Sequence, residues 1–337
     1  MALEPAVGIA GATGLVGNEM LVVLEQLDVR CKILRLFASK DSVGELYSFF
    51  GDEVEVEELN DDSFEGLDFV LFATSAELSE KYVPLAVEAG AVAIDNSSHF
   101  RMHENVPLVV PEVNIEAVTA EDKIIANPNC STIQLVPLLK VIDELAGLKR
   151  VVVSTYQSVS GAGKAALDEL WAQTRAVFTQ QEMPHDVFHN QIAFNCIPQI
   201  DILQDDGYTR EEHKIINESR KILSLPDLKI TATAVRVPVF HSHAESVNVE
   251  TREPLTPQVL IESLEKRDCF DVYPDFHEYP MQLGVTGSDS IHVGRIRRDL
   301  SVANGLDMWI VADNIRKGAA LNAVQILKAL IEREVFG

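Results

Sequence analysis

Residues 6–17, AVGIAGATGLVG, decide the fold of the first part of the chain. A short apolar run ends at Gly11, and Gly11, Gly14 and Gly17 mark a turn into a segment with apolar residues at helical spacing. A strand, a glycine-rich turn and a helix in this order let the backbone approach a pyrophosphate, whose charge then lies at the helix N-terminus. We therefore predict a dinucleotide site on this turn, and a tight turn without a ligand is the alternative.

Strand-like and helical segments alternate after this turn. Residues 32–37, 68–73 and 91–95 have the apolar character of buried strands, and residues 79–89 have the spacing of an amphipathic helix. This alternation predicts a doubly wound parallel sheet of the Rossmann type, with ligand-binding residues in the loops that follow the strands. Ser75 and Arg101 lie in two such loops, and Arg101 is a candidate for an anion site.

The loop after the second predicted strand bears on the choice of dinucleotide. Ser39, Lys40 and Ser42 offer hydroxyl and cationic donors, which suit a ribose 2′-phosphate. A cofactor without that phosphate usually meets an acidic residue here, and Asp41 is such a residue. The donors favour NADP over NAD.

A second informative stretch is residues 127–132, NPNCST, which runs into an apolar segment at helical spacing. Cys130 is therefore expected at a helix N-terminus, where unpaired N–H groups and the helix dipole stabilise a thiolate or an oxyanion. The alternative is a small buried cysteine beside an N-cap residue. The nucleophilic role is the hypothesis that the rest of the sequence has to support.

The pattern changes after the helix that follows Cys130. Strand-like runs with alternation occupy residues 150–156, 229–239, 243–251 and 308–313, and helical spacing occupies residues 164–178 and 314–334. These runs predict a mixed or antiparallel sheet covered on one face by helices. We place a dinucleotide-binding domain at residues 1–129 and a second domain at 130–313, with a closing helix over 314–337 that returns to the first domain.

Composition excludes several classes of protein. The 337 residues carry a net charge of -24, which opposes non-specific binding to nucleic acid or to an anionic membrane. No apolar run has the length of a membrane span, and residues 1–5 carry no basic targeting region, so we expect a cytoplasmic protein. The four cysteines share no metal-ligand spacing, and we expect neither disulfides nor a metal site at Cys31, Cys130, Cys196 and Cys269.

A nucleotide site together with a cysteine at a helix N-terminus suggests acyl transfer to sulfur coupled to hydride transfer. Such a reaction needs an acid/base group, and histidine is the usual choice. His243 begins a strand-like run, and Arg236 lies shortly upstream. Other histidines stay open as alternatives, although a surface or structural role is favoured for each of them: His99, His185, His189, His241 and His292.

Motifs spread over nearly the whole chain resemble the aspartate-semialdehyde dehydrogenase family. They are residues 11–17 (GATGLVG), 97–101 (SSHFR), 109–114 (VVPEVN), 127–132 (NPNCST), Gln157 with 160–163 (SGAG), 210–214 (REEHK), 236–238 (RVP) with His243, and 312–320 (ADNIRKGAA). The resemblance implies an α/β fold with an N-terminal Rossmann-type domain and an α+β catalytic and dimerisation domain similar to that of glyceraldehyde-3-phosphate dehydrogenase. Residues 72–76 depart from the family pattern, since many members carry paired glycines there.

The same resemblance implies the activity, which is the NADPH-dependent reductive dephosphorylation of L-4-aspartyl phosphate to L-aspartate 4-semialdehyde. This reaction serves lysine (through diaminopimelate), threonine and methionine biosynthesis. By the resemblance, Cys130 is the nucleophile, His243 the acid/base group and Gln157 the residue that orients the thiol and the intermediate. The substrate-binding residues implied are Arg101, Asn129, Glu211, Lys214 and Arg236, with Arg236 and Glu211 on the amino-acid end and the others on phosphate.

The resemblance also assigns the cofactor site and the assembly. The implied NADP contacts, including those of the glycine turn, are Gly11, Thr13, Gly14, Leu15, Val16, Gly17, Ser39, Ser42, Ser75, Ser160, Gly161, Gly163 and Asn314. A homodimer with a small-molecule substrate, and no nucleic acid, membrane or metal, is the implied assembly. Three alternatives stay open: another acyl-phosphate reductase such as N-acetylglutamyl-phosphate reductase, a non-catalytic dimerising partner, and a cysteine hydrolase. For Glu211 and Lys214, an exposed ion pair on a helix is the alternative.

Overall fold

The computed structural model describes residues 4–333, which form two compact units. The first comprises the chain up to Asn129 together with the residues from Ala319 onward, and the second comprises Cys130–Gly318. Within residues 4–333, no helix has both the length and the apolar character needed to cross a bilayer.

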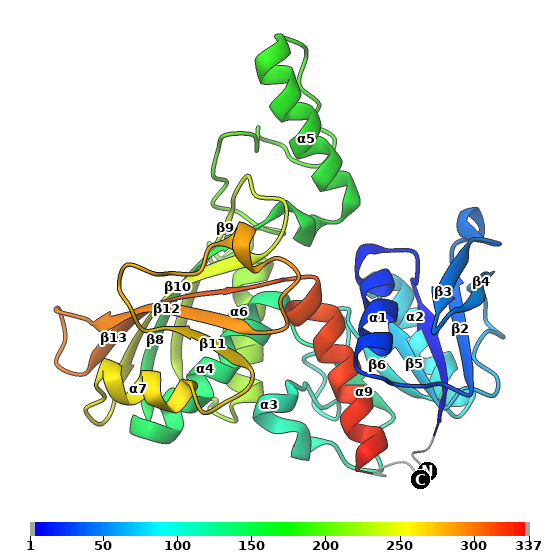
Figure 1. Cartoon of the computed structure of the whole chain (residues 1–337), viewed down its shortest axis with the longest axis horizontal. Helices are drawn as coiled ribbons and strands as arrows, with labels where there is room; N and C mark the ends of the chain where they lie inside the picture. Colours follow the sequence, from blue (N-terminus) through cyan, green and yellow to red (C-terminus); the bar gives the residue numbers. More distant parts are fainter. Residues whose placement is uncertain (1–3, 334–337) are drawn as a thin grey trace. The chain divides into compact units, whose positions relative to one another are not determined.

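The first unit is built on a seven-stranded sheet in the order β3-β4-β2-β1-β5-β6-β7 (Figure 1). Neighbouring strands are parallel except for the β3–β4 hairpin, which is antiparallel. The strands are β1 (Ala6–Ala10), β2 (Ile33–Ala38), β3 (Leu46–Phe49), β4 (Asp52–Glu58), β5 (Phe69–Phe72), β6 (Val92–Asp95) and β7 (Ile124–Ala126). The helices are α1 (Leu15–Gln26), α2 (Ala76–Glu88), α3 (Pro111–Asn114) and α9 (Asn322–Glu332).

Helices cover both faces of this sheet. Leu36 on β2 belongs to one buried cluster with residues of α1 and α9, such as Leu24 and Leu327. The next residue, Phe37, points to the other face and packs edge-on against Phe64 with ring centroids 5.9 Å apart. Successive residues of a strand face opposite sides, so two apolar neighbours require two covering layers. The predicted doubly wound Rossmann-type sheet is confirmed.

The second unit is built on a six-stranded mixed sheet in the order β11-β12-β13-β10-β8-β9. The pairs β8–β9 and β11–β12 are parallel, and the three central pairs are antiparallel. The strands are β8 (Leu148–Gln157), β9 (Lys229–Arg236), β10 (His243–Thr251), β11 (Phe270–Tyr273), β12 (Ile291–Arg298) and β13 (Gly305–Ala312). The helices are α4 (Cys130–Ala146), α5 (Lys164–Thr179), α6 (Arg210–Ile222), α7 (Pro257–Leu264) and α8 (Gln282–Val285).

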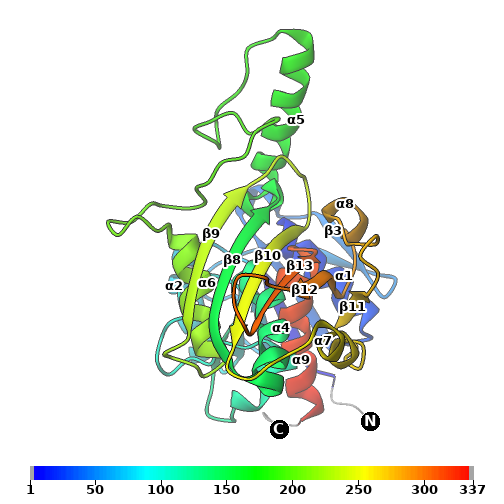
Figure 2. The ribbon, with the colours of Figure 1, turned by 90° about the vertical axis from the view of Figure 1, so that its left-hand side faces the viewer.

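Helices α4, α6 and α7 pack together along one face of the second sheet. Figure 2 shows β8, β9 and β10 curving side by side, while α5 extends beyond the end of the sheet as an arm. The inward residues of β8 and β10 are buried and alternate with half-buried or exposed ones, as expected for a sheet with one covered face. The predicted α+β arrangement of this part is confirmed.

Several boundaries differ from the sequence predictions. The acidic segment at residues 52–58, for which no strand was predicted, forms β4, which pairs with β3 on one side and with β2 on the other. Helix α2 begins at Ala76, ahead of the predicted 79, because the Ser75 hydroxyl caps it by accepting the Leu78 N–H. The predicted closing helix starts as a π-helix over Arg316–Leu321 and becomes α-helical only from Asn322. Its predicted end, 334–337, lies outside the described residues.

Candidate active site

Cys130 is the first residue of α4, with its thiol half-buried. Residues 127–129 precede the first helical residue, so the sulfur lies at the positive, N-terminal end of α4. A methyl group at Gly318 would come within 2.9 Å of the Cys130 Cβ, so only glycine leaves this space free. The helix N-terminus favours the thiolate over the thiol.

Three predicted site residues form one row across the second sheet. Gln157 ends β8, and the strand register pairs it with Arg236 at the end of β9 on one side. On its other side the register pairs it with His243 at the start of β10. Paired residues of neighbouring strands share a face, and all three side chains are buried. Residues far apart in the sequence are thus brought together at one end of the sheet.

The ring of His243 is held in one orientation by the loop after β8. The Ser158 backbone N–H donates to Nδ1 at 3.1 Å, and the Ser158 hydroxyl oxygen lies 3.1 Å from the same atom. A backbone N–H can only donate, so Nδ1 is the acceptor and the proton of the neutral ring is on Nε2. Burial, reinforced by the Arg236 charge, lowers the pKa of His243 from 6.5 to about 3. The site therefore holds a neutral imidazole with an Nε2–H donor.

Arg236 supplies the positive charge of this site. Its guanidinium is buried and donates from Nη1 to the Ser158 carbonyl at 2.7 Å. Burial lowers the pKa of Arg236, whereas the negative charges of Glu211 and Cys130 act to raise it. A buried cation close to both a carboxylate and a potential thiolate favours the ionised form of each.

Gln157 and Glu211 complete the row on the side of α6. The Gln157 amide nitrogen lies within hydrogen-bond distance of Ser131 Oγ (3.1 Å), Glu211 Oε1 (3.2 Å) and Thr155 Oγ1 (3.3 Å). Glu211 is in the first turn of α6, which begins with a reciprocal capping box between Thr209 and Glu212. The cap fixes the start of the helix and so the position of Glu211.

Lys214 makes the ion pair that its spacing suggested. Its Nζ lies 3.1 Å from Glu211 Oε2 and 2.8 Å from Asp201 Oδ2. Glu211 is nearly buried, with 7% of its side chain exposed, so the pair is not the solvent-exposed one considered as the alternative.

Asn314 follows β13 and organises the loops around His243. Its Oδ1 accepts from Ser242 N at 2.9 Å and from the hydroxyls of Ser158 and Ser160 at 3.2 Å each. The Asn314 amide oxygen thus connects the loop that holds the His243 ring to Ser242, the residue that precedes His243. Ser158 was not predicted, because nothing in its type or spacing distinguishes it from the serines beside it.

The dinucleotide-type turn lies in the first unit. Gly11 has a left-handed φ of +82°, and a methyl group there would lie 2.5 Å from the Ala73 carbonyl oxygen in the loop after β5. A methyl group at Gly17 would lie 2.2 Å from the Gly11 carbonyl oxygen, so the helix can pack this tightly only with glycine. The β1 and β5 loops meet where the strand order reverses, which is where doubly wound sheets bind dinucleotides.

The other predicted residues of the first unit differ in their surroundings. Arg101 is buried and donates to the carbonyls of Asn127 and Asn96 at 2.9 Å each. Asn129, directly before Cys130, is buried. Ser39 is exposed and Ser42 half-buried, on a short 3₁₀ turn over Lys40–Ser42 after β2.

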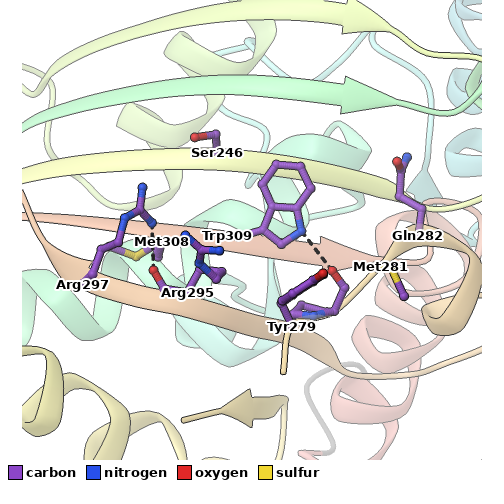
Figure 3. A pocket seen from close by; sticks show the side chains of 9 residues that line it. Ser246, Tyr279, Met281, Gln282, Arg295, Arg297, Met308 and Trp309 are labelled. Atoms are coloured by element: carbon purple, nitrogen blue, oxygen red, sulfur yellow. Dashed lines mark hydrogen bonds between the residues drawn. The ribbon is translucent and has the colours of Figure 1, made fainter. Parts of the chain in front are cut away.

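The cavity drawn in Figure 3 is separate from this row of residues. It measures about 370 Å³ and is lined by residues that include Ser246, Arg295 and Trp309. Ser246 lies an odd number of residues from His243 on β10, so the two side chains point to opposite faces of the sheet. The cavity therefore lies on the face opposite α4, α6 and α7, and Gln282 of α8 contributes to its lining.

Known proteins identify the class to which this fold and site belong. A family model of the semialdehyde dehydrogenase NAD binding domain matches residues 6–121, and one of the semialdehyde dehydrogenase dimerisation domain matches residues 135–317. The chain therefore belongs to the semialdehyde dehydrogenase family. Within it, the chain belongs with the aspartate-semialdehyde dehydrogenases, as its similarity to individual members shows.

Two curated relatives and one solved structure give the extent of that similarity. The chain is 47% identical over 333 residues to aspartate-semialdehyde dehydrogenase 2 of Vibrio cholerae, with 98% of each chain covered. It is 46% identical over 334 residues to the aspartate-semialdehyde dehydrogenase of Bacillus subtilis, with 96% of each covered. The crystal structure of aspartate semialdehyde dehydrogenase II from Vibrio cholerae matches with a TM-score of 0.95 at 46% identity, covering 98% of this chain and 99% of that one.

We expect Gly161→Ala to impair the site without unfolding the protein. Gly161 is exposed on the 3₁₀ turn Val159–Ala162, and a methyl group there would lie 2.9 Å from Arg236 Nη1 and 3.3 Å from His243 Nε2. A displacement of this size at reacting groups lowers kcat/KM by about 10- to 100-fold. Steady-state kinetics and thermal unfolding check this, with Ala162→Ser, at the exposed next position, as the matched control. An unchanged kcat/KM for Gly161→Ala would contradict the prediction.

Proposed function

We propose that this chain catalyses the NADPH-dependent reductive dephosphorylation of L-4-aspartyl phosphate to L-aspartate 4-semialdehyde. The observation that carries the proposal is the placement of Cys130 at a helix N-terminus near the buried row of Arg236, Gln157 and His243. A structure of the Vibrio cholerae relative is described as complexed with ASA, which supports the same substrate class for this chain.

The proposed reaction begins with attack of the Cys130 thiolate on the acyl carbon of the substrate. The sulfur–carbon bond forms, the bond from carbon to the phosphate oxygen breaks, and phosphate leaves with the electron pair. A thioester on Cys130 remains. The positive end of the α4 dipole and the Arg236 guanidinium stabilise the thiolate before the attack and the oxyanion that develops during it.

His243 acts on the oxygen of the sulfur adduct. Its Nε2 carries the proton, and a methyl group at Gly161 would be 3.3 Å from this atom, so the glycine keeps its approach open. Reduction of the thioester leaves a thiohemiacetal oxyanion, to which Nε2–H donates. Collapse of the adduct then breaks the carbon–sulfur bond and releases the aldehyde and the thiolate.

The two ends of the substrate need opposite charges. Arg236 and Glu211 provide a cation and an anion for the amino acid's carboxylate and ammonium groups. Arg101, Lys214 and Asn129 are proposed for the phosphate. Lys214 now pairs with Glu211 and Asp201, so binding of phosphate is expected to compete with these contacts.

The residues of the first unit fit the dinucleotide. The backbone of the Gly11, Gly14 and Gly17 turn has no Cβ to block a pyrophosphate, and at Gly17 no side chain would fit. NADPH, when bound, supplies the hydride that reduces the thioester. Ser39 and Ser42 are proposed for the ribose 2′-phosphate. The remaining proposed contacts are Thr13, Leu15, Val16 and Ser75 in the first unit and Ser160, Gly161, Gly163 and Asn314 in the second.

We also propose a homodimer formed through the second unit, which matches a dimerisation domain. The face of its sheet opposite α4, α6 and α7 carries Tyr156 and Trp309, whose rings lie 5.2 Å apart and which pack against the cluster that includes Val285 of α8. Met281, which lines the same cavity as Trp309, is 62% exposed, as expected of a side chain that a second copy covers. The mass of the particle in solution tests this. The cysteines are free thiols, in keeping with a reducing compartment, and the cytoplasm remains a prediction.

A substrate comparison tests the function. In the oxidative direction, we expect phosphate-dependent reduction of NADP with aspartate semialdehyde to be faster by orders of magnitude than with N-acetylglutamate semialdehyde, because Glu211 is proposed to bind a free ammonium group. Omission of phosphate is the control within each assay. Faster reaction with the acetylated aldehyde would favour N-acetylglutamyl-phosphate reductase. Hydrolysis without change at NADP would favour a cysteine hydrolase.

A further inference from the structure

Ser242, the residue directly before His243, has an unusual backbone conformation. Its φ is +69°, in the left-handed region that residues with a Cβ atom rarely adopt. The residue is fully buried and directly precedes β10. Such a conformation persists in a folded protein only where the surrounding groups hold it, and it is common next to functional residues. The contacts of Ser242 therefore bear on how His243 is oriented.

Each polar group of Ser242 has a partner. Its N–H donates to Asn314 Oδ1 at 2.9 Å, and its hydroxyl oxygen lies 3.0 Å from the hydroxyl oxygen of Thr286. Its carbonyl oxygen accepts from Gln282 Nε2 at 2.8 Å. Gln282 is the first residue of α8, and Thr286 directly follows that helix. Two of the three partners thus come from an element that has no part in the proposed reaction.

The Gln282 amide connects the ends of two strands. Its Nε2 donates to the Tyr156 carbonyl at 2.9 Å as well as to that of Ser242, and an amide nitrogen has one N–H for each. Tyr156 directly precedes Gln157, and Ser242 directly precedes His243. The strand register pairs Gln157 with His243. One side chain thus holds together the two backbone segments that carry these predicted catalytic residues.

Helix α8 is anchored to the sheet without the predicted catalytic residues. Val285, with 2% of its surface exposed, packs in a buried cluster with residues of β10 and β13. The N–H of Gly287, shortly after the helix, donates to Asp313 Oδ2 at 2.8 Å. Gln282 lines the cavity on the face opposite α4, α6 and α7 (Figure 3). It therefore reaches the strand ends from the face opposite the His243 side chain.

We propose that Gln282 is a positioning residue for His243. By holding the carbonyls at two strand ends, it keeps Ser242 left-handed and so directs the imidazole at the Ser158 N–H. Without these two hydrogen bonds we expect Ser242 to relax toward an ordinary φ, which moves Nδ1 of His243 away from its donor. The Nε2–H would then no longer be fixed in one place. The effect on turnover rests on the proposed function, whereas the orientation of the ring does not.

Gln282→Leu tests the proposal, because leucine keeps most of the volume and removes both donors. We expect kcat to fall about 10- to 100-fold, the size of effect that a small displacement of a reacting group has. Substrate KM should stay within about threefold of wild type, because Arg236 and Glu211 are not altered. Gly284→Ala is the matched control in α8, since a methyl group there meets nothing within 4 Å. Wild-type kcat in Gln282→Leu would overturn the proposal.

A second substitution separates positioning of Ser242 from simple attachment of α8. Glycine adopts a left-handed φ without a steric penalty, so in a Ser242→Gly background the backbone depends less on Gln282. There we expect Gln282→Leu to lower kcat by at most about threefold. In a Ser242→Ala background, which loses the same hydroxyl but keeps Cβ, we expect the full loss. Equal losses in the two backgrounds would overturn the proposal, because Gln282 would then act only by fastening α8. Thermal unfolding shows that each variant compared is folded.

The ¹⁵N resonances of the His243 ring, assigned by their absence in His243→Asn, give a readout that needs no turnover. In the wild type we expect one neutral tautomer, with the proton on Nε2 and Nδ1 as acceptor. In Gln282→Leu we expect a mixture of the two tautomers, because Nδ1 has lost its fixed donor. An unchanged single tautomer in the folded variant would overturn the proposal even if kcat fell. Absence of aspartate semialdehyde activity in the wild type would instead refute the proposed function and leave this test of Gln282 intact.

Discussion

Cys130→Ala is expected to lower the reductase activity by at least about 10⁴-fold, because without the sulfur no thioester can form. The protein should still fold, since the side chain is half-buried and small and the α4 backbone does not depend on it. The measurement is phosphate-dependent reduction of NADP with aspartate semialdehyde, together with thermal unfolding.

Cys196→Ala is the matched control for Cys130→Ala, because Cys196 is exposed and lies in the same unit. We expect it to keep wild-type kcat. Peptide mapping after iodoacetamide treatment should place the inactivating label on Cys130 and show protection by substrate. Full activity in Cys130→Ala, or inactivation by a label on Cys31, Cys196 or Cys269 alone, would remove the basis of the proposed mechanism.

The second large effect is expected at His243. In His243→Asn the shorter side chain reaches the position of Nδ1, where it can still accept from Ser158 N–H, but it has no group at the position of Nε2. Loss of this donor should lower kcat about 10²- to 10⁴-fold. The KM for substrate should change less, since Arg236 and Glu211 are retained. An unchanged kcat would show that Nε2 takes no part in turnover.

The pH dependence of His243 is also expected to be unusual. Its pKa is lowered from 6.5 to about 3, so the neutral ring persists well below neutral pH and wild-type activity should show no inflection near 6.5 from this residue. The unfolded chain, in contrast, binds a proton on this histidine below pH 6.5 that the folded chain does not. Stability should therefore fall as the pH drops from 6.5 toward about 3, and less steeply in His243→Asn.

Local sequence patterns were enough to predict much of the first unit. The apolar run before Gly11 and the periodic residues after Gly17 gave β1 and α1 because each pattern has only one regular structure that buries it. The hairpin of β3 and β4 was missed because β4 is rich in glutamate, which is uncommon in strands and typical of loops. The π-helix at Arg316–Leu321 was missed because its sequence has the same spacing as an α-helix.

In the candidate site, the position of one residue could be predicted from its neighbours in the sequence, but the pairing of the others could not. Cys130 could be placed from its own neighbourhood, because a helix start is a local event. That Gln157 lies between Arg236 and His243 could not, since strand register is set by contacts between segments distant in the sequence. The catalytic roles of all these residues stay predictions.

The alternation along β10 has a consequence for how this protein can diverge. His243 and Glu245 point to one side, and Ala244 and Ser246 to the other, toward the surface proposed for a second copy. A replacement of the exposed Ser246 can therefore reshape subunit recognition while the chemistry persists, and a replacement of His243 can do the reverse, whereas Ala244 is fully buried against Val285 and Val311. Insertion of one residue within β10 would exchange the two sets and abolish both properties at once.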